Sequence, residues 1–304
     1  MPPATVFAPP RLSYHSAMIT SERIQAALAA RHGLPVRHCR VDALGGGDTG
    51  ATFRVDLDGR PAFLKWLPEG DALDAEADGL AALATAIRVP EVLDHGDLAG
   101  GRGLLLEWLP LAAPGESFWP AFGRALAALH GVEGERFGHH RDNWIGANPQ
   151  YNRSDTDWAR FFVDQRLAPQ LRWARDRGLD AALVERLERV MARVPVWLKG
   201  LTIRPVRVHG DLWRGNVGTL AGDRPVVFDP AVYHGHAEVD LAMLSLFGRV
   251  PEAFYRAYGK NADDPAFQHR VRLYNLYHLL NHFNLFGGGY AGAVSDSATA
   301  LLRY

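Results

Sequence analysis

Three polar residues in the last third of the chain have types and a spacing that suit phosphoryl transfer. In the segment VHGDLWRGNVG, Asp211 and Asn216 are five residues apart in an expected loop, and Asp229 follows thirteen residues later, where the apolar run PVVFD ends. In a phosphoryl-transfer site one carboxylate accepts or orients the proton of the attacking hydroxyl, while an amide oxygen and a second carboxylate hold Mg²⁺ against the nucleotide phosphates. Each residue alone would more often cap a turn or a helix, but the three together predict a kinase-type site.

A lysine and a glutamate in the first third of the chain could clamp the phosphates of the nucleotide. Lys65 lies at the end of the strand-like run AFLKW, and Glu76 follows eleven residues later on an expected helix. A lone lysine at a strand end is usually solvated, but this order is typical of a phosphate-binding lysine held by a helix glutamate. We therefore predict that Lys65 and Glu76 take part in binding ATP.

Two further segments could contact the nucleotide through their backbone. The turn GGGDTG at 45–50, which contains Gly46 and Gly47, could lie over the phosphates, although such a turn is also an ordinary hairpin. It does not match GxGxxG, and the sequence has no GxxxxGK[ST] motif, which disfavours a P-loop NTPase. The stretch LLLEWLPL at 104–111 is typical of a buried strand that enters a hinge, where backbone groups near Glu107 and Leu109 would meet the adenine.

The first third of the chain predicts a small lobe of strands and helices that positions these groups. A short helix is expected at 20–32, because Thr20 or Ser21 can cap its start. Asp58 and Gly59 mark a hairpin between two strand-like runs. The expected order is a helix, three strands (41–44, 52–57 and 62–66), a helix (71–87) and two strands within 89–111.

After Leu109 the pattern becomes mainly helical. Helices are expected at 118–131, 155–178 and 179–194, two short β-runs within 204–248, and mostly helix from Pro251 to 287–290. We therefore predict an α+β fold with two lobes. A small antiparallel sheet with a helix (18–108) would clamp the nucleotide, and a larger, mainly helical lobe (109–304) would carry the catalytic loop and the metal and substrate sites. Residues 1–17, with four prolines, are expected to be a disordered extension, and Met18 is an alternative start to Met1.

Charge and hydropathy restrict the partners and the location. The chain has 33 Lys and Arg against 34 Asp and Glu, a net charge of −1, which argues against a nucleic-acid or membrane-surface partner. No window approaches the roughly 18 apolar residues of a membrane span. The first seventeen residues lack the basic start and the apolar stretch of a signal peptide. We expect a cytoplasmic monomer.

The cysteine and histidine residues do not form the motifs of a zinc site. The single cysteine, Cys39, excludes an intramolecular disulfide and any cysteine-based zinc cluster. The thirteen histidines form no HExxH motif, and two pairs, His139 with His140 and His234 with His236, have no carboxylate support in their motifs. Most histidines are therefore expected to be loop or core residues, and zinc is not expected.

Five segments of the chain carry a resemblance to a known family. The segments HGDLWRGN and FDPAVYHGHAEVDLAM mark the aminoglycoside phosphotransferase and choline kinase-like group, and three further segments resemble those of the fructosamine kinase (ketosamine-3-kinase) family within it. They are FGHHRDNWIGANPQYN (137–152), WARFFVDQRLAPQLRWA (158–174) and LYNLYHLLNHFNLFGGGY (273–290). The resemblance covers about residues 19–290 and implies a protein-kinase-like fold. Asp48 stands where some members of the family carry a cysteine, so redox control at that place is not expected.

The resemblance implies a role for each matched residue. Asp211 would be the catalytic base, Asn216 and Asp229 the magnesium ligands, and Lys65 with Glu76 the phosphate clamp. The hydroxyl on C3 of a ketosamine would attack the γ-phosphate of ATP, and the unstable product would release the amine, which amounts to deglycation or repair.

Other residues near these motifs would support the loop or contact the substrate. His209 would brace the catalytic loop by hydrogen bonds, and Glu238 and Asp240 would brace the loop and cap a helix. Trp213, Asn143 and the region of His282 are candidates for substrate contact, and for Trp213 core packing is the alternative.

Two other functions stay open at this point. A related kinase for an aminoglycoside, choline or a homoserine-like alcohol would share the catalytic set, but should lack the segments 137–152 and 158–174. A pseudokinase would be expected to lose the base, a metal ligand or the clamp lysine, all of which are present. The preferred sugar, and whether the amine is free or protein-bound, do not follow from the sequence.

Overall fold

The computed structural model describes residues 19–44 and 50–304. The predicted extension 1–17, the alternative start Met18, and Gly46, Gly47 and Asp48 of the glycine-rich turn lie outside the described residues. No helix in the described ranges is long and apolar enough to span a membrane.

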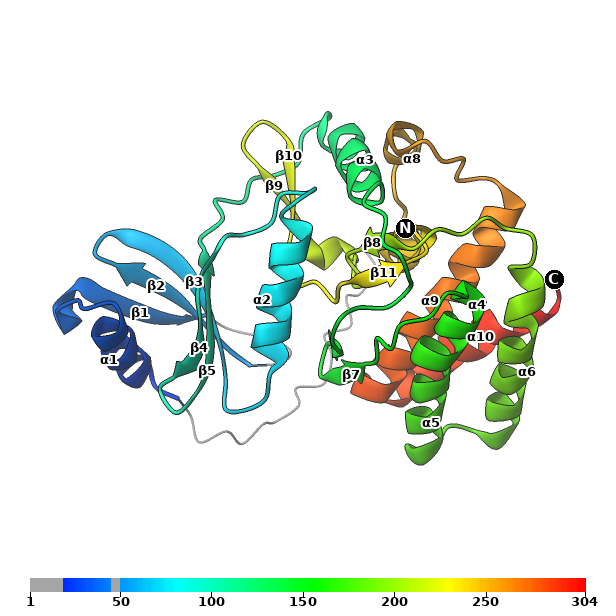
Figure 1. Cartoon of the computed structure of the whole chain (residues 1–304), viewed down its shortest axis with the longest axis horizontal. Helices are drawn as coiled ribbons and strands as arrows, with labels where there is room; N and C mark the ends of the chain where they lie inside the picture. The colour runs from blue at the N-terminus through cyan, green and yellow to red at the C-terminus, as the bar shows by residue number, and fades with distance from the viewer. Residues whose placement is uncertain (1–18, 45–49) are drawn as a thin grey trace, which may run out of the picture.

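The N-terminal part of the chain is built on a five-stranded antiparallel sheet (Figure 1). Its strands are β1 (Cys39–Leu44), β2 (Ala51–Leu57), β3 (Arg60–Leu67), β4 (Val92–Leu98) and β5 (Gly101–Glu107). Their order in the sheet is β1-β2-β3-β5-β4. Asp58 and Gly59, both with positive φ, make the hairpin between β2 and β3, as their sequence predicts.

Alternation along β3 decides which side chains face the active site. Successive side chains of a strand point to opposite faces of the sheet. Leu64 and Trp66 are buried in the core on one face. Lys65, between them, therefore projects from the opposite face, where it pairs across the strands with Leu104.

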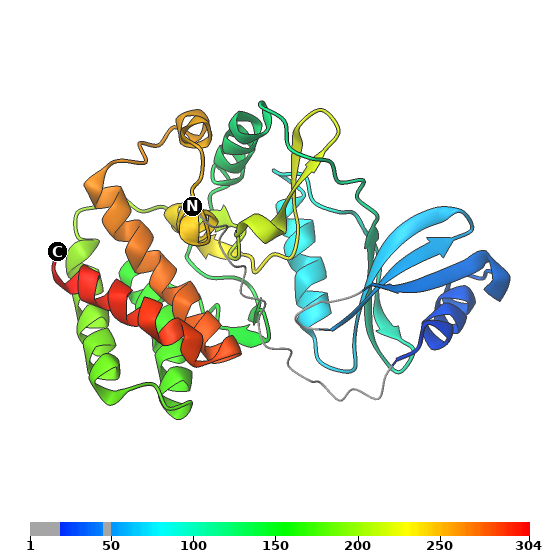
Figure 2. The same ribbon diagram turned by 180° about the vertical axis from the view of Figure 1, so that it is seen from behind.

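One helix covers each face of the sheet. The helix α1 (Ser21–Arg31) begins where Thr20 Oγ1 accepts a hydrogen bond from Arg23 N, and it buries Ile24 and Leu28 against the outer face. Burying a side chain of this size contributes roughly 1.5–3 kcal/mol. The helix α2 (Ala72–Leu83) lies on the opposite face, between the sheet and the helical part of the molecule (Figure 2).

The rest of the chain is mainly helical and follows a connection at 108–117. Its longest helix, α9 (Pro265–Phe286), packs against three others, α5, α7 and α10. The helices are α3 (Phe118–Leu129), α4 (Trp158–Phe161), α5 (Ala168–Asp176), α6 (Ala181–Trp197), α7 (Glu238–Leu246), α8 (Glu252–Tyr258) and α10 (Ala291–Leu302), with a π-helical segment, Phe162–Leu167, between α4 and α5.

Short two-stranded ladders hold the loops of the helical part. They are β6 (Asn143–Ile145) with β7 (Asn148–Gln150), β8 (Val206–Val208) with β11 (Tyr233–Gly235), and β9 (Val217–Leu220) with β10 (Arg224–Val227). The sequence predicted two β-runs within 204–248, whereas the structure has four strands there. The β6–β7 hairpin and α10 were also missed. Strands of three or four residues are too short to show a period of two. The α+β class is confirmed.

Candidate active site

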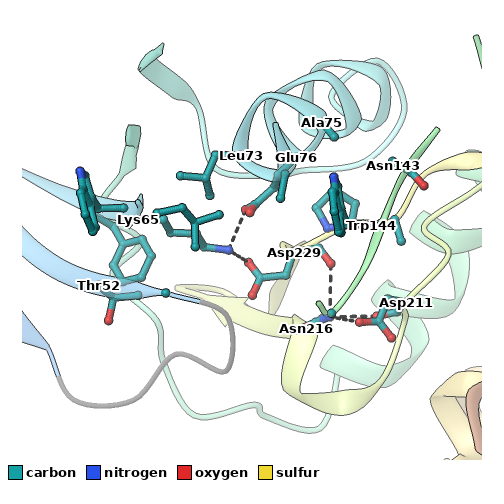
Figure 3. Close-up of a pocket in the computed structure, with 18 of the residues that line it drawn as sticks. Thr52, Lys65, Leu73, Ala75, Glu76, Asn143, Trp144, Asp211, Asn216 and Asp229 are labelled. Atoms are coloured by element: carbon teal, nitrogen blue, oxygen red, sulfur yellow. Dashed lines mark hydrogen bonds and ion pairs between the residues drawn. The ribbon is translucent and has the colours of Figure 1, made fainter. Parts of the chain in front are cut away.

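A cavity of about 430 Å³ opens between the sheet, α2 and the loops that follow β8 and β10 (Figure 3). It brings together most of the residues predicted from the sequence to form the site. Those that line it are Lys65, Glu76, Asn143, Asp211, Trp213, Asn216 and Asp229. Glu107, Leu109 and His282, also predicted, are not among the residues that line it.

Lys65 is held between two carboxylates. Its Nζ lies 2.7 Å from Oε1 of Glu76 on α2 and 2.5 Å from Oδ1 of Asp229 (Figure 3). Burial alone would lower the pKa of Lys65, but the two carboxylates outweigh this and raise it above its usual value. The lysine therefore stays protonated and offers a fixed positive charge to an anionic ligand. The expected pairing of Lys65 with Glu76 is confirmed.

The catalytic loop is shaped by a glycine that no other residue could replace without strain. Gly210 has φ +84°, and a Cβ built on it would lie 2.0 Å from the carbonyl oxygen of Ala231. The backbone N–H groups of His209 and Gly210 donate to the Asp240 carboxylate at 2.7 and 2.9 Å. Asp240 thus holds the loop just before Asp211, as its sequence position predicts.

The buried ring of His209 fixes the backbone on both sides of the loop. Its Nε2 donates to the Phe228 carbonyl oxygen at 3.0 Å, and its Nδ1 accepts from Asp211 N at 3.3 Å. Burial lowers the pKa of His209, so the ring is neutral and can use one nitrogen as donor and the other as acceptor. The bracing role predicted for His209 is confirmed.

Asp211 combines the properties of a proton acceptor. Burial, together with the negative charges of Asp229 and Asp240, raises the pKa of Asp211 to about 7. The amide of Asn216 opposes this rise: its Nδ2 lies 2.9 Å from Asp211 O and 3.4 Å from Asp211 Oδ2. A carboxylate with a pKa near the working pH is well suited to general base catalysis.

Asn216 and Asp229 present hard oxygen atoms that fit a divalent cation such as Mg²⁺. Nδ2 of Asn216 donates to the backbone carbonyl oxygen of Asp211, so Oδ1 is the atom of the Asn216 amide that remains to bind a cation. The Asp229 side chain is 46% exposed, and only its Oδ1 is paired with Lys65. Asp229 also has φ +57°, an uncommon left-handed backbone that costs of order 1 kcal/mol and occurs preferentially at functional sites.

The three residues predicted to contact substrate differ in their surroundings. Trp213 is 39% exposed, lines the cavity and packs edge-on against Phe247. Asn143 also lines it, but its Nδ2 donates to Val232 O and its Oδ1 accepts from the amides of Gln150 and Asn152. Asn143 therefore uses its side chain to organise the β6–β7 hairpin.

His282 lies one aromatic layer behind the cavity. Its Nδ1 is 2.7 Å from the His278 carbonyl oxygen, and its ring packs against Phe247, which in turn contacts Trp213. Phe247 thus connects the ring of His282 to Trp213 at the cavity.

The predicted hinge residues make framework contacts. The Glu107 carboxylate accepts hydrogen bonds from Arg88, and its backbone N donates to Glu91 O at 2.9 Å. The carbonyl of Leu109 accepts from Leu111 N. Their contact with adenine stays a prediction.

Several residues of the cavity were not found from the sequence. Trp144 lies next to Asn143, and its Nε1 donates to Asp71 Oδ1 at 2.9 Å. The sequence signal that could have identified Trp144 was its position directly after Asn143, a residue predicted to contact substrate. The other missed residues include apolar side chains whose types alone carry no functional signal: Phe63, Leu67, Leu73 and Pro230.

Comparison with solved structures defines the class of protein. The aminoglycoside phosphotransferase APH(4)-Ia, with 17% identity, superposes with a TM-score of 0.64 over 86% of this chain and 93% of that chain, which shows a shared fold. A Thermobifida fusca protein assigned as a fructosamine-3-kinase is 37% identical, with a TM-score of 0.79 over 87% of this chain and 93% of that chain. Together with the site, these likenesses define a phosphotransferase of the protein-kinase-like fold, as predicted.

The sequence comparisons place the chain more narrowly. The profile of the fructosamine kinase family matches residues 20–304, and the chain belongs to that family. A Synechocystis protein assigned as a ketoamine kinase is 46% identical over 75% of this chain and 78% of its own length. The chloroplastic protein-ribulosamine 3-kinase of Arabidopsis thaliana is 35% identical over 87% of this chain and 83% of its own length. The family resemblance read from the five segments is confirmed.

Proposed function

We propose that this protein transfers the γ-phosphate of ATP to the 3-hydroxyl of ketosamines, such as fructosamine- or ribulosamine-type glycated amines. Family membership and the names of its relatives support this activity. The observation that carries it is the convergence in one cavity of Asp211, Asn216 and Asp229 with Lys65. Phosphorylation at C3 would make the sugar prone to lose phosphate and release the amine, so the biological role is deglycation or repair.

Asp211 is the group that handles the proton in this proposal. A hydroxyl placed beside its carboxylate would pass its proton to Asp211 as the new bond to the γ-phosphorus forms, the bond from that phosphorus to the bridging oxygen breaks, and ADP leaves. The raised pKa of Asp211 matches the requirement for a base that works near neutral pH. Asp240 and His209 keep this carboxylate in place through the loop backbone.

Lys65, Asn216 and Asp229 supply the charge and the ligands. Lys65 would bind phosphate oxygens with its fixed positive charge, and Glu76 would hold the lysine in position. Asn216 Oδ1 and the Asp229 carboxylate would hold Mg²⁺. The cation would neutralise charge on the phosphates. The contribution of the protein is thus mostly positioning and electrostatic stabilisation.

The proposal also assigns a role to each part of the chain, a cellular location and an oligomeric state. Residues 18–108 would act as the nucleotide clamp, with Glu107 and Leu109 next to the adenine, and residues 109–304 would hold the catalytic and substrate groups. Trp213, exposed at the rim, would pack against the sugar or its linked amine. We also propose that the enzyme is a cytoplasmic monomer, which light scattering on the purified protein and localisation of a tagged chain would test.

A substrate panel tests the proposed activity. Purified protein with Mg-ATP should phosphorylate ribulosyl-, fructosyl- or erythrulosyl-lysine, and Asp211→Asn should reduce turnover by about 10³-fold or more while ATP binding persists. Turnover of an aminoglycoside or choline, with none of the ketosamines, would refute the substrate class. Binding of ATP without turnover of any acceptor would favour the pseudokinase alternative.

A further inference from the structure

A second polar cluster joins α2 to the helical part on a side of α2 away from the active-site cavity. The loop at 137–142 runs along this helix, and its residues contact carboxylates spaced two turns apart. Arg141 Nη2 lies 2.6 Å from Asp71 Oδ2 at the start of α2, while His139 and His140 face Asp78. Asp78, His139 and His140 do not line the active-site cavity.

The geometry of this cluster is that of converging metal ligands. His139 Nε2 lies 2.9 Å from Asp78 Oδ2, and His140 Nε2 lies 3.4 Å from Asp78 Oδ1. One ligand atom from each of the three residues lies within 4.8 Å of the other two. Among the described residues this is the one group of three or more His, Cys, Asp or Glu that converges in this way. Two ligands about 2.0–2.2 Å from a tetrahedral Zn²⁺ are themselves roughly 3.4 Å apart. The 2.9 Å pair would therefore separate slightly, and a pair near the 4.8 Å limit would close by about 1.4 Å, which side-chain rotation can supply.

The surroundings combine a buried ligand with an open position. The side chain of His139 is 9% exposed, that of Asp78 32% and that of His140 62%. Burial lowers the pKa of His139, and the proton that its Nε2 donates to Asp78 at 2.9 Å would be released when a cation binds to that nitrogen. A cavity of about 490 Å³ adjoins the three residues and is also lined by His234, so solvent can reach a fourth ligand position.

We propose that Asp78, His139 and His140 form a binding site for a divalent transition metal of the zinc type, with water completing the coordination. Two imidazoles and a carboxylate suit Zn²⁺, Co²⁺ or Ni²⁺, whereas Mg²⁺ prefers an all-oxygen site such as Asn216 and Asp229 offer. The adjacent histidines alone do not predict this site, because the carboxylate partner of His139 lies 61 positions away on α2.

A metal at this site would fasten α2 to the helical part. Asp78 lies two residues after Glu76, which holds Lys65, so a metal bound to Asp78 restrains the helix that positions the clamp. Arg207 Nη1 already donates to Ala82 O at the far end of α2, at 2.8 Å. The metal would therefore replace the contacts of Asp78 with the two histidines by a stronger connection, between the two ends of α2 that are already held, and it would raise the thermal stability of the protein.

Metal titration of the full-length, tag-free, chelator-treated protein tests the site. With excess Mg²⁺ present, Zn²⁺ competed against a chromogenic chelator should bind with a stoichiometry of one and raise the Tm. His139→Gln and His140→Gln should each weaken this binding by at least about tenfold and remove the Tm shift. Co²⁺ in place of Zn²⁺ should give visible ligand-field bands that the same variants lose. His140 is mostly exposed, so its variant should fold normally.

Two controls separate this site from other places where zinc can bind. His95→Gln removes a comparable exposed histidine that lies 3.2 Å from Asp74 Oδ1, and it should leave zinc binding unchanged. Asp229→Asn should also retain the bound equivalent. The proposal is overturned if the wild type binds no equivalent, if both His139→Gln and His140→Gln bind as the wild type does, or if Asp229→Asn alone loses the metal. These measurements need neither ATP nor a sugar, so they stand apart from the proposed kinase activity.

Discussion

Lys65 and Asp229 are 164 positions apart in the chain, yet Nζ of the lysine lies 2.5 Å from Oδ1 of the aspartate. This ion pair joins the sheet to the loop that follows β10. Because Glu76 contacts the same Nζ, three residues from three elements meet at one positive charge. The charge of Lys65 is therefore central to the contact between the two parts of the molecule, and in the proposed function the same charge would bind phosphate.

Replacing Lys65 should impair catalysis more than stability. Lys65→Met removes the positive charge from the cavity, so we expect kcat/KM to fall by about 10²-fold or more. Repulsion between Glu76 and Asp229 should also lower the Tm slightly. Steady-state kinetics and thermal unfolding measure both effects. Lys199→Met, at an exposed position in the turn after α6, is the matched control and should change neither. Wild-type kinetics for Lys65→Met would remove Lys65 from its assigned role.

Asp240 should prove more important to the fold than a typical acidic residue. Its carboxylate accepts from the backbone of His209 and Gly210 and from the ring of His130, all in a buried setting. Asp240→Ala leaves two buried N–H groups without an acceptor, at about 1–3 kcal/mol each. We expect a loss of about 3 kcal/mol or more in the free energy of unfolding, measured by urea denaturation, and a fall in kcat. The exposed Asp296→Ala is the control, and an equal effect in both variants would contradict the prediction.

Comparing two glycines tests whether close packing around Gly210, in addition to its positive φ, holds the loop that carries Asp211. Gly210 and Gly222 both have positive φ, +84° and +76°, but only Gly210 has a neighbour within 4 Å of a built Cβ. Gly222→Ala should cost only the left-handed penalty of about 1–2 kcal/mol and keep full activity. Gly210→Ala should displace the loop and reduce kcat by at least about 10²-fold. Similar kinetics for the two variants would show that the loop tolerates the displacement.

The stability of the protein should fall in mild acid because histidines are buried. Burial lowers the pKa of His236 to about 4 and that of His278 to about 3. In an unfolded chain the pKa of a histidine is about 6.5. Between these values the two histidines bind more protons in the unfolded chain than in the folded one. Asp211, whose folded pKa of about 7 lies above its usual value, has the opposite sign and offsets part of this effect. The stabilisation is therefore complete above about pH 6.5, decreases as the pH falls, and is gone once the pH is below the folded values.

Urea unfolding at a series of pH values checks this dependence. The free energy of unfolding of the wild type should decrease from about pH 6.5 to about pH 4, and His278→Leu should reduce the slope because it removes one of the titrating groups. The exposed His38→Gln should keep the slope of the wild type. A free energy of unfolding that does not change over this range would contradict the prediction.

Local patterns in the sequence predicted the sheet and much of the site, whereas contacts between distant segments could not be predicted. The alternation of Leu64, Lys65 and Trp66 places the lysine on one face, and the spacing to Glu76 places its partner on the covering helix. Both are local properties of a strand and a helix. By contrast, the ion pair with Asp229 depends on how the two parts of the molecule meet, which no local period encodes.

The same distinction explains where the site predictions were incomplete. The segment around Asn143 predicts substrate contact, but the hydrogen bonds of Asn143 to Val232, Gln150 and Asn152 form only in the folded hairpin. The histidine pair at 139–140 looked unsupported, because the supporting Asp78 comes from a helix in the other part of the chain. Residue types indicate what chemistry is available, and the tertiary structure decides which groups remain free to perform it.

Trp213 should affect recognition of the sugar substrate more than the transfer step. Trp213 is 39% exposed and lines the cavity, and its ring is supported on one side by Phe247. An aromatic ring in this position offers apolar area to a substrate without taking part in proton transfer. Trp213→Ala should therefore raise the KM for a ketosamine about tenfold or more, with small changes in kcat and in the KM for ATP. Trp197→Ala, on the distant helix α6, serves as a control for the loss of an indole and should leave both KM values unchanged. If Trp213→Ala instead lowered kcat and left the KM for the ketosamine unchanged, Trp213 would support the neighbouring Asp211 loop and would have no direct contact with the substrate.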